Sequence, residues 1–326
     1  MLLNIVLLVA SLGVLTIGAE MLVRGASGVA KLLGVSSLVI GLTIVGFGTS
    51  TPELAAGITS SLKGVSDLNV GNVVGSNIFN ILMILGITSL ICPIAVQMKV
   101  VKREVLWVIG AALAIYTTLV TGGTVTRVHG VLLLAGLVFY IVRTYQLGRV
   151  ETAPMEDIPG VEKGRPRVWL DVVLIAVGLG MLWGGSVLLV DSSVDIARTL
   201  GVSELTIALT IVAGGTSAPE LITSTVAALR RKTDIAVGNI LGSNVFNIFG
   251  ILGTTSTIFG QKVSTQVLRF DGPVMVLASL ALIPIIASGN RITRTEGALM
   301  LVAFAAYLVL QFTLVPGWFG AEASVP

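Results

Sequence analysis

Long stretches of apolar residues, separated by short groups of charged and glycine residues, extend over nearly the whole chain. A helix that crosses a membrane needs about 20 apolar residues, and ten stretches approach or exceed this length. They cover residues 3–32, 37–62, 69–91, 101–120, 126–145, 168–198, 203–229, 235–258, 269–289 and 295–315. The pattern predicts an all-α integral membrane protein with ten transmembrane helices.

One long polar segment, residues 146–167, divides the predicted helices into two groups of five. It contains three prolines and several side chains of either charge, a composition that is typical of a loop. We therefore predict five helices over residues 1–145, a linker over residues 146–167 and five further helices over residues 168–326.

The composition agrees with a chain surrounded mostly by lipid. Of its 326 residues, 54% are hydrophobic and 11% are charged, whereas a soluble domain carries about a quarter of charged residues. The single cysteine, Cys92, excludes an intrachain disulfide. The single histidine, His129, argues against a histidine-rich metal centre.

Basic residues predict how the helices are oriented in the membrane. If the N-terminus lies outside, the segments on the inner side carry 15 of the 20 Lys and Arg residues. Cytoplasmic loops are the ones enriched in Lys and Arg. We therefore expect a multi-pass protein of the cell membrane with both termini outside and the linker in the cytoplasm. Within the first predicted helix, Glu20 and Arg24 are four residues apart and are expected to pair.

Residues 42–81 and 209–248 carry closely related sequences. They align without a gap at a constant offset of 167, and 21 of 40 positions are identical. Chance does not produce such a match, so it indicates an internal duplication. Because five predicted helices separate the copies, the second copy enters the membrane from the opposite side. The chain is thus predicted to consist of two inverted five-helix repeats, which many secondary transporters share.

Each copy places a proline near the middle of a predicted helix. Proline removes a backbone donor and clashes with the carbonyl four residues earlier, so the helix breaks or kinks. Irregular backbone in a membrane is tolerated where it is buried in protein or lines a wet cavity. Carbonyl oxygens beside a carboxylate are suitable ligands for sodium or calcium. The freed carbonyls are expected near Gly46, Thr49, Ala213 and Thr216.

Glu53 and Glu220 directly follow the two prolines. An acidic side chain at this depth costs a few kcal/mol and is usually functional. Two glutamates at matching depth favour a divalent cation, whose charge balances theirs, and protons are then expected to compete for the site. The structural alternative is a protonated glutamate that is hydrogen-bonded to a neighbouring helix.

The second half of each copy contains a group of small and amide side chains. Ser76 and Asn80 are four residues apart and share one helical face, as do Ser243 and Asn247. Their oxygens can complete a shell of oxygen ligands around the cation. The alternative is close helix packing with interhelical hydrogen bonds, and for the neighbouring glycines both interpretations stay open.

These motifs resemble the calcium/cation antiporter superfamily, specifically its sodium/calcium exchanger branch of prokaryotic type. The resemblance is carried by GTSTPE at 48–53, GTSAPE at 215–220, GSNIFN at 75–80 and GSNVFN at 242–247, and the helix layout extends it over nearly the whole chain. It implies that sodium is exchanged for calcium by alternating access and that Glu53 and Glu220 bind both ions. The further ligands that it implies are Thr49, Thr216, Gly46, Ser50, Ser76, Ala213, Ser217 and Ser243.

Two departures within the superfamily bear on the transported ions. Some members, including potassium-dependent ones, carry Asp where this chain has Asn247, so potassium co-transport is not expected here. The proton/calcium branch carries a different motif around its glutamates, so the GTSxPE motif favours sodium. No cofactor is expected, the transported ions are Ca²⁺ and Na⁺, and ten helices suffice to enclose the site in a monomer.

Three alternatives stay open from the sequence. A proton/calcium antiporter would use the same two glutamates as proton acceptors. A passive cation channel usually requires a symmetric oligomer or a selectivity filter, and no filter-like sequence is present. A membrane enzyme such as an intramembrane protease is disfavoured, because the chain lacks an HExxH motif and the repeat contains no pair of aspartates. The chain is therefore expected not to be an enzyme.

Overall fold

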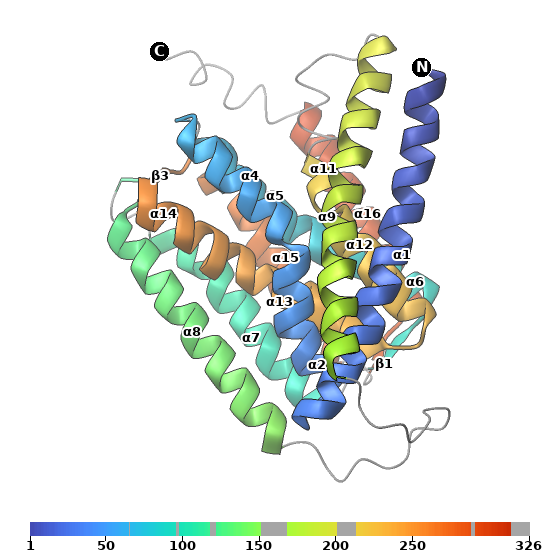
Figure 1. The fold of residues 1–326 in the computed structure, drawn as a ribbon. Helices are drawn as coiled ribbons and strands as arrows, with labels where there is room; N and C mark the ends of the chain where they lie inside the picture. Colours follow the sequence, from blue (N-terminus) through green and yellow to red (C-terminus); the bar gives the residue numbers. More distant parts are fainter. Residues whose placement is uncertain are drawn as a thin grey trace. The chain divides into compact units, whose positions relative to one another are not determined.

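The computed structural model describes residues 1–64, 66–95, 98–117, 122–150, 168–200, 213–287 and 291–313 (Figure 1). Contacts divide the chain into two compact units. Unit 1 consists of residues 1–49 and 138–242, and unit 2 consists of residues 50–137 and 243–326. Each unit thus takes segments from both predicted repeats, so packing and duplication divide the chain in different ways.

Unit 1 is entirely helical in its described part. Its elements are α1 (Leu2–Leu33), α2 (Ser37–Ile40), the π-helix η1 (Gly41–Val45), α3 (Gly46–Thr49), the end of α8 (Arg127–Val150), α9 (Val168–Thr199), α11 (Ala213–Thr216), α12 (Ala218–Leu229) and most of α13 (Thr233–Val245). The long helices α1 and α9 lie side by side and run antiparallel (Figure 1). At one end of this pair, Asn4 Nδ2 donates to Asp195 Oδ2 at 3.4 Å.

Glycines allow α1 and α9 to approach closely. A Cβ atom at Gly18 would lie 2.9 Å from the carbonyl oxygen of Gly178, and a Cβ atom at Gly178 would lie 2.7 Å from that of Gly18. Small residues at such crossings let the two backbones touch, which favours helix association in lipid. Leu15, Leu22 and Leu182 fill the same interface and are buried.

Unit 2 is helical apart from four two-residue strands, which the all-α prediction did not include. Its elements are α4 (Thr51–Leu62), α5 (Ser66–Ile78), η2 (Phe79–Ile84), α6 (Leu85–Ile91), β1 (Ile94–Ala95), α7 (Met98–Ala114), β2 (Thr124–Val125), the beginning of α8, the end of α13, η5 (Phe246–Leu252), α14 (Gly253–Phe259), β3 (Gln261–Lys262), η6 (Val267–Asp271), α15 (Gly272–Ala287), β4 (Arg291–Ile292) and α16 (Arg294–Thr313).

Several elements of unit 2 recur at the offset of the sequence repeat. The π-helices η2 and η5 begin at Phe79 and Phe246, which are 167 residues apart (246 − 79 = 167). The strand pairs follow the same rule. In one pair Ile94 faces Ile292, and in the other Gln261 faces Val125, so each partner of the first pair matches one of the second.

Seven helices are long and apolar enough to cross a membrane, or eight if the bent pair 37–49 and 51–62 counts as one span. Helix α7 has 17 residues. Residues 203–212 of the predicted seventh span lie outside the described residues, as do residues 151–167 of the predicted linker. Helix α8 extends to Val150 and so includes the first residues assigned to the linker.

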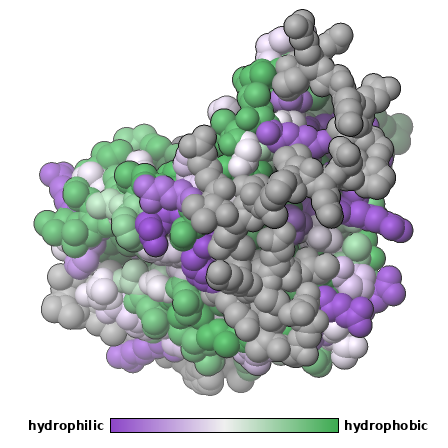
Figure 2. Space-filling view, turned by 90° about the horizontal axis from the view of Figure 1, so that it is seen from below, coloured by the Kyte–Doolittle hydropathy of each residue, from purple (hydrophilic) through white to green (hydrophobic). Residues whose placement is uncertain are grey.

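Large apolar side chains are exposed on several of these helices, as expected where lipid is the solvent. Leu2, Val128 and Val302 have exposed fractions of 77%, 68% and 66%. Figure 2 views the end that lies at the bottom of Figure 1, and there groups of hydrophilic residues alternate with hydrophobic patches. Polar groups at helix ends and apolar flanks between them are typical of a membrane protein.

The close contact of α1 and α9 leads to a first prediction. Gly178→Ala should destabilise the protein, because the new methyl group meets backbone atoms of α1, and overpacking of this kind costs about 1–3 kcal/mol. Gly180→Ala is the matched control, since a Cβ atom there meets nothing within 4 Å. Thermal unfolding of the detergent-solubilised protein, followed by tryptophan fluorescence, should show a lower midpoint for Gly178→Ala alone. Equal midpoints for both variants would contradict this packing.

Candidate functional site

The first proline break has a defined geometry. The segment η1–α3 ends at Thr49, and α4 begins at Thr51 after a bend of 41°. Ser50 occupies the break with φ −82° and ψ 9°, and Pro52 stands in the first turn of α4. Proline is tolerated at this position because the first N–H groups of a helix lack intrahelical partners. The predicted break at the GTSTPE motif is therefore present.

The second break repeats this geometry. Helix α11 ends at Thr216, α12 begins at Ala218, and Ser217 has φ −88° and ψ 8°. Pro219 again stands in the first turn. The two serines differ by 6° in φ and 1° in ψ, so the duplicated sequence forms the same local structure twice.

Both glutamates are buried. Glu53 in the first turn of α4 and Glu220 in the first turn of α12 each have an exposed fraction of 1%. A carboxylate at the N-terminus of a helix is stabilised by the helix dipole. Burial at this position removes the carboxylate from bulk water, so ligands from the protein or a bound ion must replace its hydration shell.

The twelve candidate ligands are distributed equally over the two compact units. Unit 1 contains Gly46, Thr49, Ala213, Thr216, Ser217 and Glu220. Unit 2 contains Ser50, Glu53, Ser76, Asn80, Ser243 and Asn247. Most of their side chains are buried. The Thr216 side chain is half-buried, and the surroundings of the Ala213 side chain lie outside the described part of the chain.

In unit 1, the buried amide of Asn239 connects the two motifs. Thr49 Oγ1 donates to Asn239 Oδ1 at 2.9 Å. Asn239 Nδ2 in turn donates to the carbonyl oxygen of Glu220 at 3.3 Å and to Ser224 Oγ at 2.9 Å. Asn239 therefore holds the end of α3 beside the first turn of α12. The Thr49 hydroxyl also donates to the Gly46 carbonyl at 3.4 Å, a carbonyl that was expected to be freed by the break.

In unit 2, four asparagines form a hydrogen-bond network that follows the repeat. Asn80 Nδ2 donates to Asn244 Oδ1 at 3.3 Å, and Asn247 Nδ2 donates to Asn77 Oδ1 at 3.0 Å. These two bonds are equivalent at the offset of 167. Because the amide nitrogens are engaged, the Oδ1 atoms of Asn80 and Asn247 are fixed in orientation. Among the described residues neither oxygen has a hydrogen-bond donor, although both are buried.

The π-helices lie at the same places. Asn80 is the second residue of η2, and Asn247 is the second residue of η5. A π-turn widens the helix locally and is frequently found at functional sites. Among the described residues, no group of three or more His, Cys, Asp or Glu side chains gathers in a way that suits a metal ion.

Three asparagines that take part in these contacts were not among the predicted site residues, namely Asn77, Asn239 and Asn244. The signal was present in the sequence, because all three belong to motif positions that are identical in both copies. The structure also decides between the two interpretations for two glycines. A Cβ atom at Gly238 or Gly242 would meet the backbone of residues 38–42 at 2.3–2.8 Å, so both glycines serve helix packing.

Comparison with known proteins agrees with the motifs. The family model described as sodium/calcium exchanger protein matches residues 3–146 and 170–313. A protein named as an antiporter, CaxA of Alkalimonas amylolytica, is 38% identical over 322 residues, which cover 96% of this chain and 100% of the relative. The sodium/calcium exchanger MaX1 of Methanosarcina acetivorans is 31% identical and covers 95% of this chain and 98% of its own length.

A solved structure of the sodium-calcium exchanger NCX_Mj has the same fold. Its TM-score is 0.80 at 30% sequence identity, with 96% of this chain and 99% of that chain covered. Together with the family model, which spans both groups of helices, this likeness extends well beyond the motifs. The chain therefore belongs to the sodium/calcium exchanger family and is a multi-span membrane protein of the cation/calcium antiporter class.

Proposed function

We propose that this protein exchanges sodium for calcium across the cell membrane by alternating access and that Glu53 and Glu220 bind the transported ions. The observation that carries the proposal is the pair of matching breaks, each followed by a glutamate that is 1% exposed. Two carboxylates balance the charge of one calcium ion. Sodium ions at the same ligands would balance the same charge, which permits exchange.

Neutral oxygens are proposed to complete the site. Calcium takes six to eight oxygen ligands at about 2.3–2.6 Å, more than two carboxylates provide. The Oδ1 atoms of Asn80 and Asn247 are suitable candidates, because both are buried acceptors that lack a donor among the described residues. The hydroxyl and carbonyl oxygens assigned to the site are those of Thr49, Thr216, Ser50, Ser217, Ser76, Ser243, Gly46 and Ala213.

The asparagines support sodium over potassium as the coupled ion. Asn80 and Asn247 are neutral and bonded to other asparagines, so the proposed site has two full negative charges. We further propose ten transmembrane helices in two inverted repeats, with both termini outside, the linker in the cytoplasm and a complete site in one chain. The recurrence of η2 in η5 and of one strand pair in the other supports the repeats.

The function is tested by uptake of radioactive calcium into proteoliposomes loaded with sodium and diluted into choline medium. Uptake should require internal sodium and should collapse when a sodium ionophore is added. Uptake that is indifferent to sodium but driven by a proton gradient would contradict sodium coupling and favour a proton/calcium antiporter. Flux that does not depend on the ion on the opposite side would favour a channel.

The site assignment predicts the effect of neutralising either glutamate. Glu53→Gln and Glu220→Gln should each reduce sodium-driven calcium uptake by about 30-fold or more, because loss of one charged partner in a buried site costs about 2–5 kcal/mol. Glu151→Gln, in the polar segment after α8, is the matched control and should transport normally. Substantial uptake by either site variant would refute the assignment.

Asn247 offers a test of the ion preference. Asn247→Asp adds a negative charge at the proposed site and removes the donor that now bonds Asn77 Oδ1. The calcium concentration for half-maximal uptake, or its dependence on sodium, should therefore change by about tenfold. Asn69→Asp is the control, since Asn69 is also a buried asparagine of unit 2. An unchanged ion profile for Asn247→Asp would place residue 247 outside the ligand shell.

The proposed orientation is tested by labelling a single cysteine. In a Cys92→Ser background, the variant Glu156→Cys should react with a membrane-impermeant maleimide only after the cells are opened. Labelling of intact cells would reverse the orientation.

A further inference from the structure

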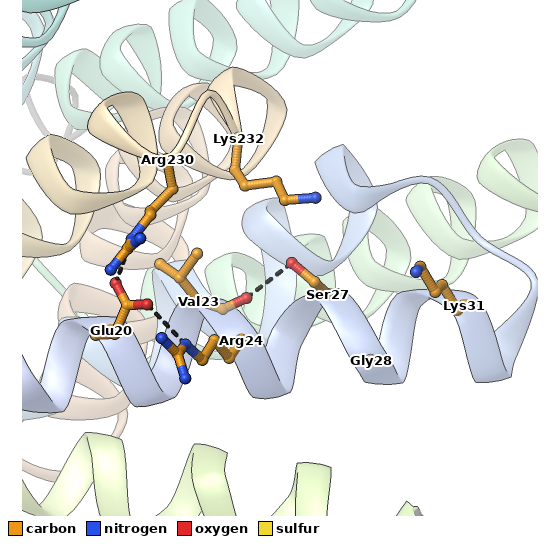
Figure 3. A pocket seen from close by; sticks show the side chains of 8 residues that line it. All are labelled: Glu20, Val23, Arg24, Ser27, Gly28, Lys31, Arg230 and Lys232. Carbon is orange, nitrogen blue, oxygen red and sulfur yellow. Dashed lines mark hydrogen bonds and ion pairs between the residues drawn. The ribbon is translucent and has the colours of Figure 1, made fainter. Parts of the chain in front are cut away.

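A cleft with excess positive charge lies between α1 and the turn that joins α12 to α13, all within unit 1 (Figure 3). Its volume is about 420 Å³. It is lined by four cationic side chains and one carboxylate, together with Val23, Ser27 and Gly28. The charged residues are Glu20, Arg24, Lys31, Arg230 and Lys232. Asp171 of α9 also lies against Gly28, so four cations face two carboxylates in this region.

Two of the four cations are engaged and two are available. Glu20 accepts from Arg24 Nε at 2.6 Å and from Arg230 Nε at 2.8 Å, which confirms the expected pair and adds a partner from α12. No described residue forms an ion pair with Lys31 or Lys232. Figure 3 shows the Lys232 side chain pointing along α1 toward Lys31, away from the Glu20 cluster. The two ammonium groups therefore provide unneutralised charge at one end of the cleft.

The turn that carries Arg230 and Lys232 is fixed by its backbone. The Lys232 N–H donates to Ala227 O at 2.8 Å, and the Arg231 N–H donates to Ala228 O at 2.9 Å, as in a Schellman motif. Arg231 has φ 57° and is the only described residue other than glycine with a positive φ. This conformation costs a side chain about 1 kcal/mol or more, and Gly64 stands at the equivalent position of the first copy.

The cleft is not a product of the duplication. At the offset of 167, Glu20 matches Val187, Arg24 matches Asp191 and Lys232 matches Val65. Most of its charges are thus absent from the other copy, whereas the transport motifs are present in both. The cleft therefore belongs to one end of unit 1 and is independent of the proposed ion site.

An apolar groove adjoins the cleft. It has a volume of about 570 Å³ and shares Glu20, Arg24 and Arg230 with the cleft. Its remaining lining is mostly apolar and comes from α1 and α9, namely Thr16, Ile17, Met21, Leu170 and Leu174. A cationic cleft that continues into an apolar groove matches a molecule with an anionic head and a hydrocarbon chain.

The position along α1 agrees with the depth of a lipid headgroup. Residues 2–19 of α1 carry no charge, and 18 helical residues span about 27 Å, close to the thickness of about 30 Å of the hydrocarbon core. Glu20 and the cations that follow it therefore lie where the hydrocarbon ends. Basic pockets between helices at this level bind anionic headgroups.

We propose that this cleft and groove bind one anionic phospholipid, with its phosphate between Lys31 and Lys232 and an acyl chain along Ile17 and Leu174. The lipid would bridge α1 to the α12–α13 turn, beside the ion pair of Glu20 and Arg230. The site holds whichever side of the membrane it faces, because the recognition depends on charge and on apolar contact alone.

The test is native mass spectrometry of the full chain in detergent, titrated with dioleoylphosphatidylglycerol or with dioleoylphosphatidylcholine. The wild type should bind one phosphatidylglycerol at least about tenfold more tightly than phosphatidylcholine. Lys31→Ala/Lys232→Ala should weaken phosphatidylglycerol binding by about 30-fold, from the loss of two lysine contacts. The control Lys63→Ala/Lys262→Ala removes two exposed lysines of unit 2 and should bind as the wild type does.

Three results would overturn the proposal. Equal binding of both lipids by the wild type would show that the cations do not select an anionic head. Unchanged binding by Lys31→Ala/Lys232→Ala would locate the lipid elsewhere. Displacement of phosphatidylglycerol by millimolar inorganic phosphate would identify a free-anion site. None of these measurements involves transport, so they are independent of the proposed function.

Discussion

A helix that is broken inside a membrane protein leaves backbone groups that lipid cannot satisfy, and in this chain each of two breaks also buries a glutamate. The protein meets this constraint with amide side chains. Asn239 binds the Thr49 hydroxyl and the Glu220 carbonyl. In unit 2, paired bonds orient Asn80 and Asn247 so that their oxygens stay available. The broken helices are thereby held in place while acceptor oxygens are kept for a cation.

Close packing is the second requirement of this arrangement. Helices α1 and α9 contact one another through Gly18 and Gly178, and α13 contacts residues 38–42 through Gly238 and Gly242. Lipid tails provide no hydrophobic force that would drive helices together, so small residues and interhelical hydrogen bonds must do so. The glycines of the motifs and the asparagines beside them are therefore parts of one structural solution.

The sequence predicted those features that depend on local chemistry. Proline in an apolar helix predicted the breaks at Ser50 and Ser217, and a spacing of four residues predicted the pair of Glu20 and Arg24. It did not predict contacts between distant segments. Arg230 lies 210 residues from Glu20, and no local pattern indicates that they meet. The two-residue strands and the π-turns depend on tertiary contacts in the same way.

The central claim is that the two buried glutamates bind calcium and that sodium competes for the same site. Equilibrium binding of radioactive calcium to the solubilised protein tests it most directly. The account predicts one bound calcium per chain, displaced by sodium with a Hill coefficient above one, and no binding by Glu220→Gln. Calcium binding that sodium does not displace, or that persists in Glu220→Gln, would contradict it.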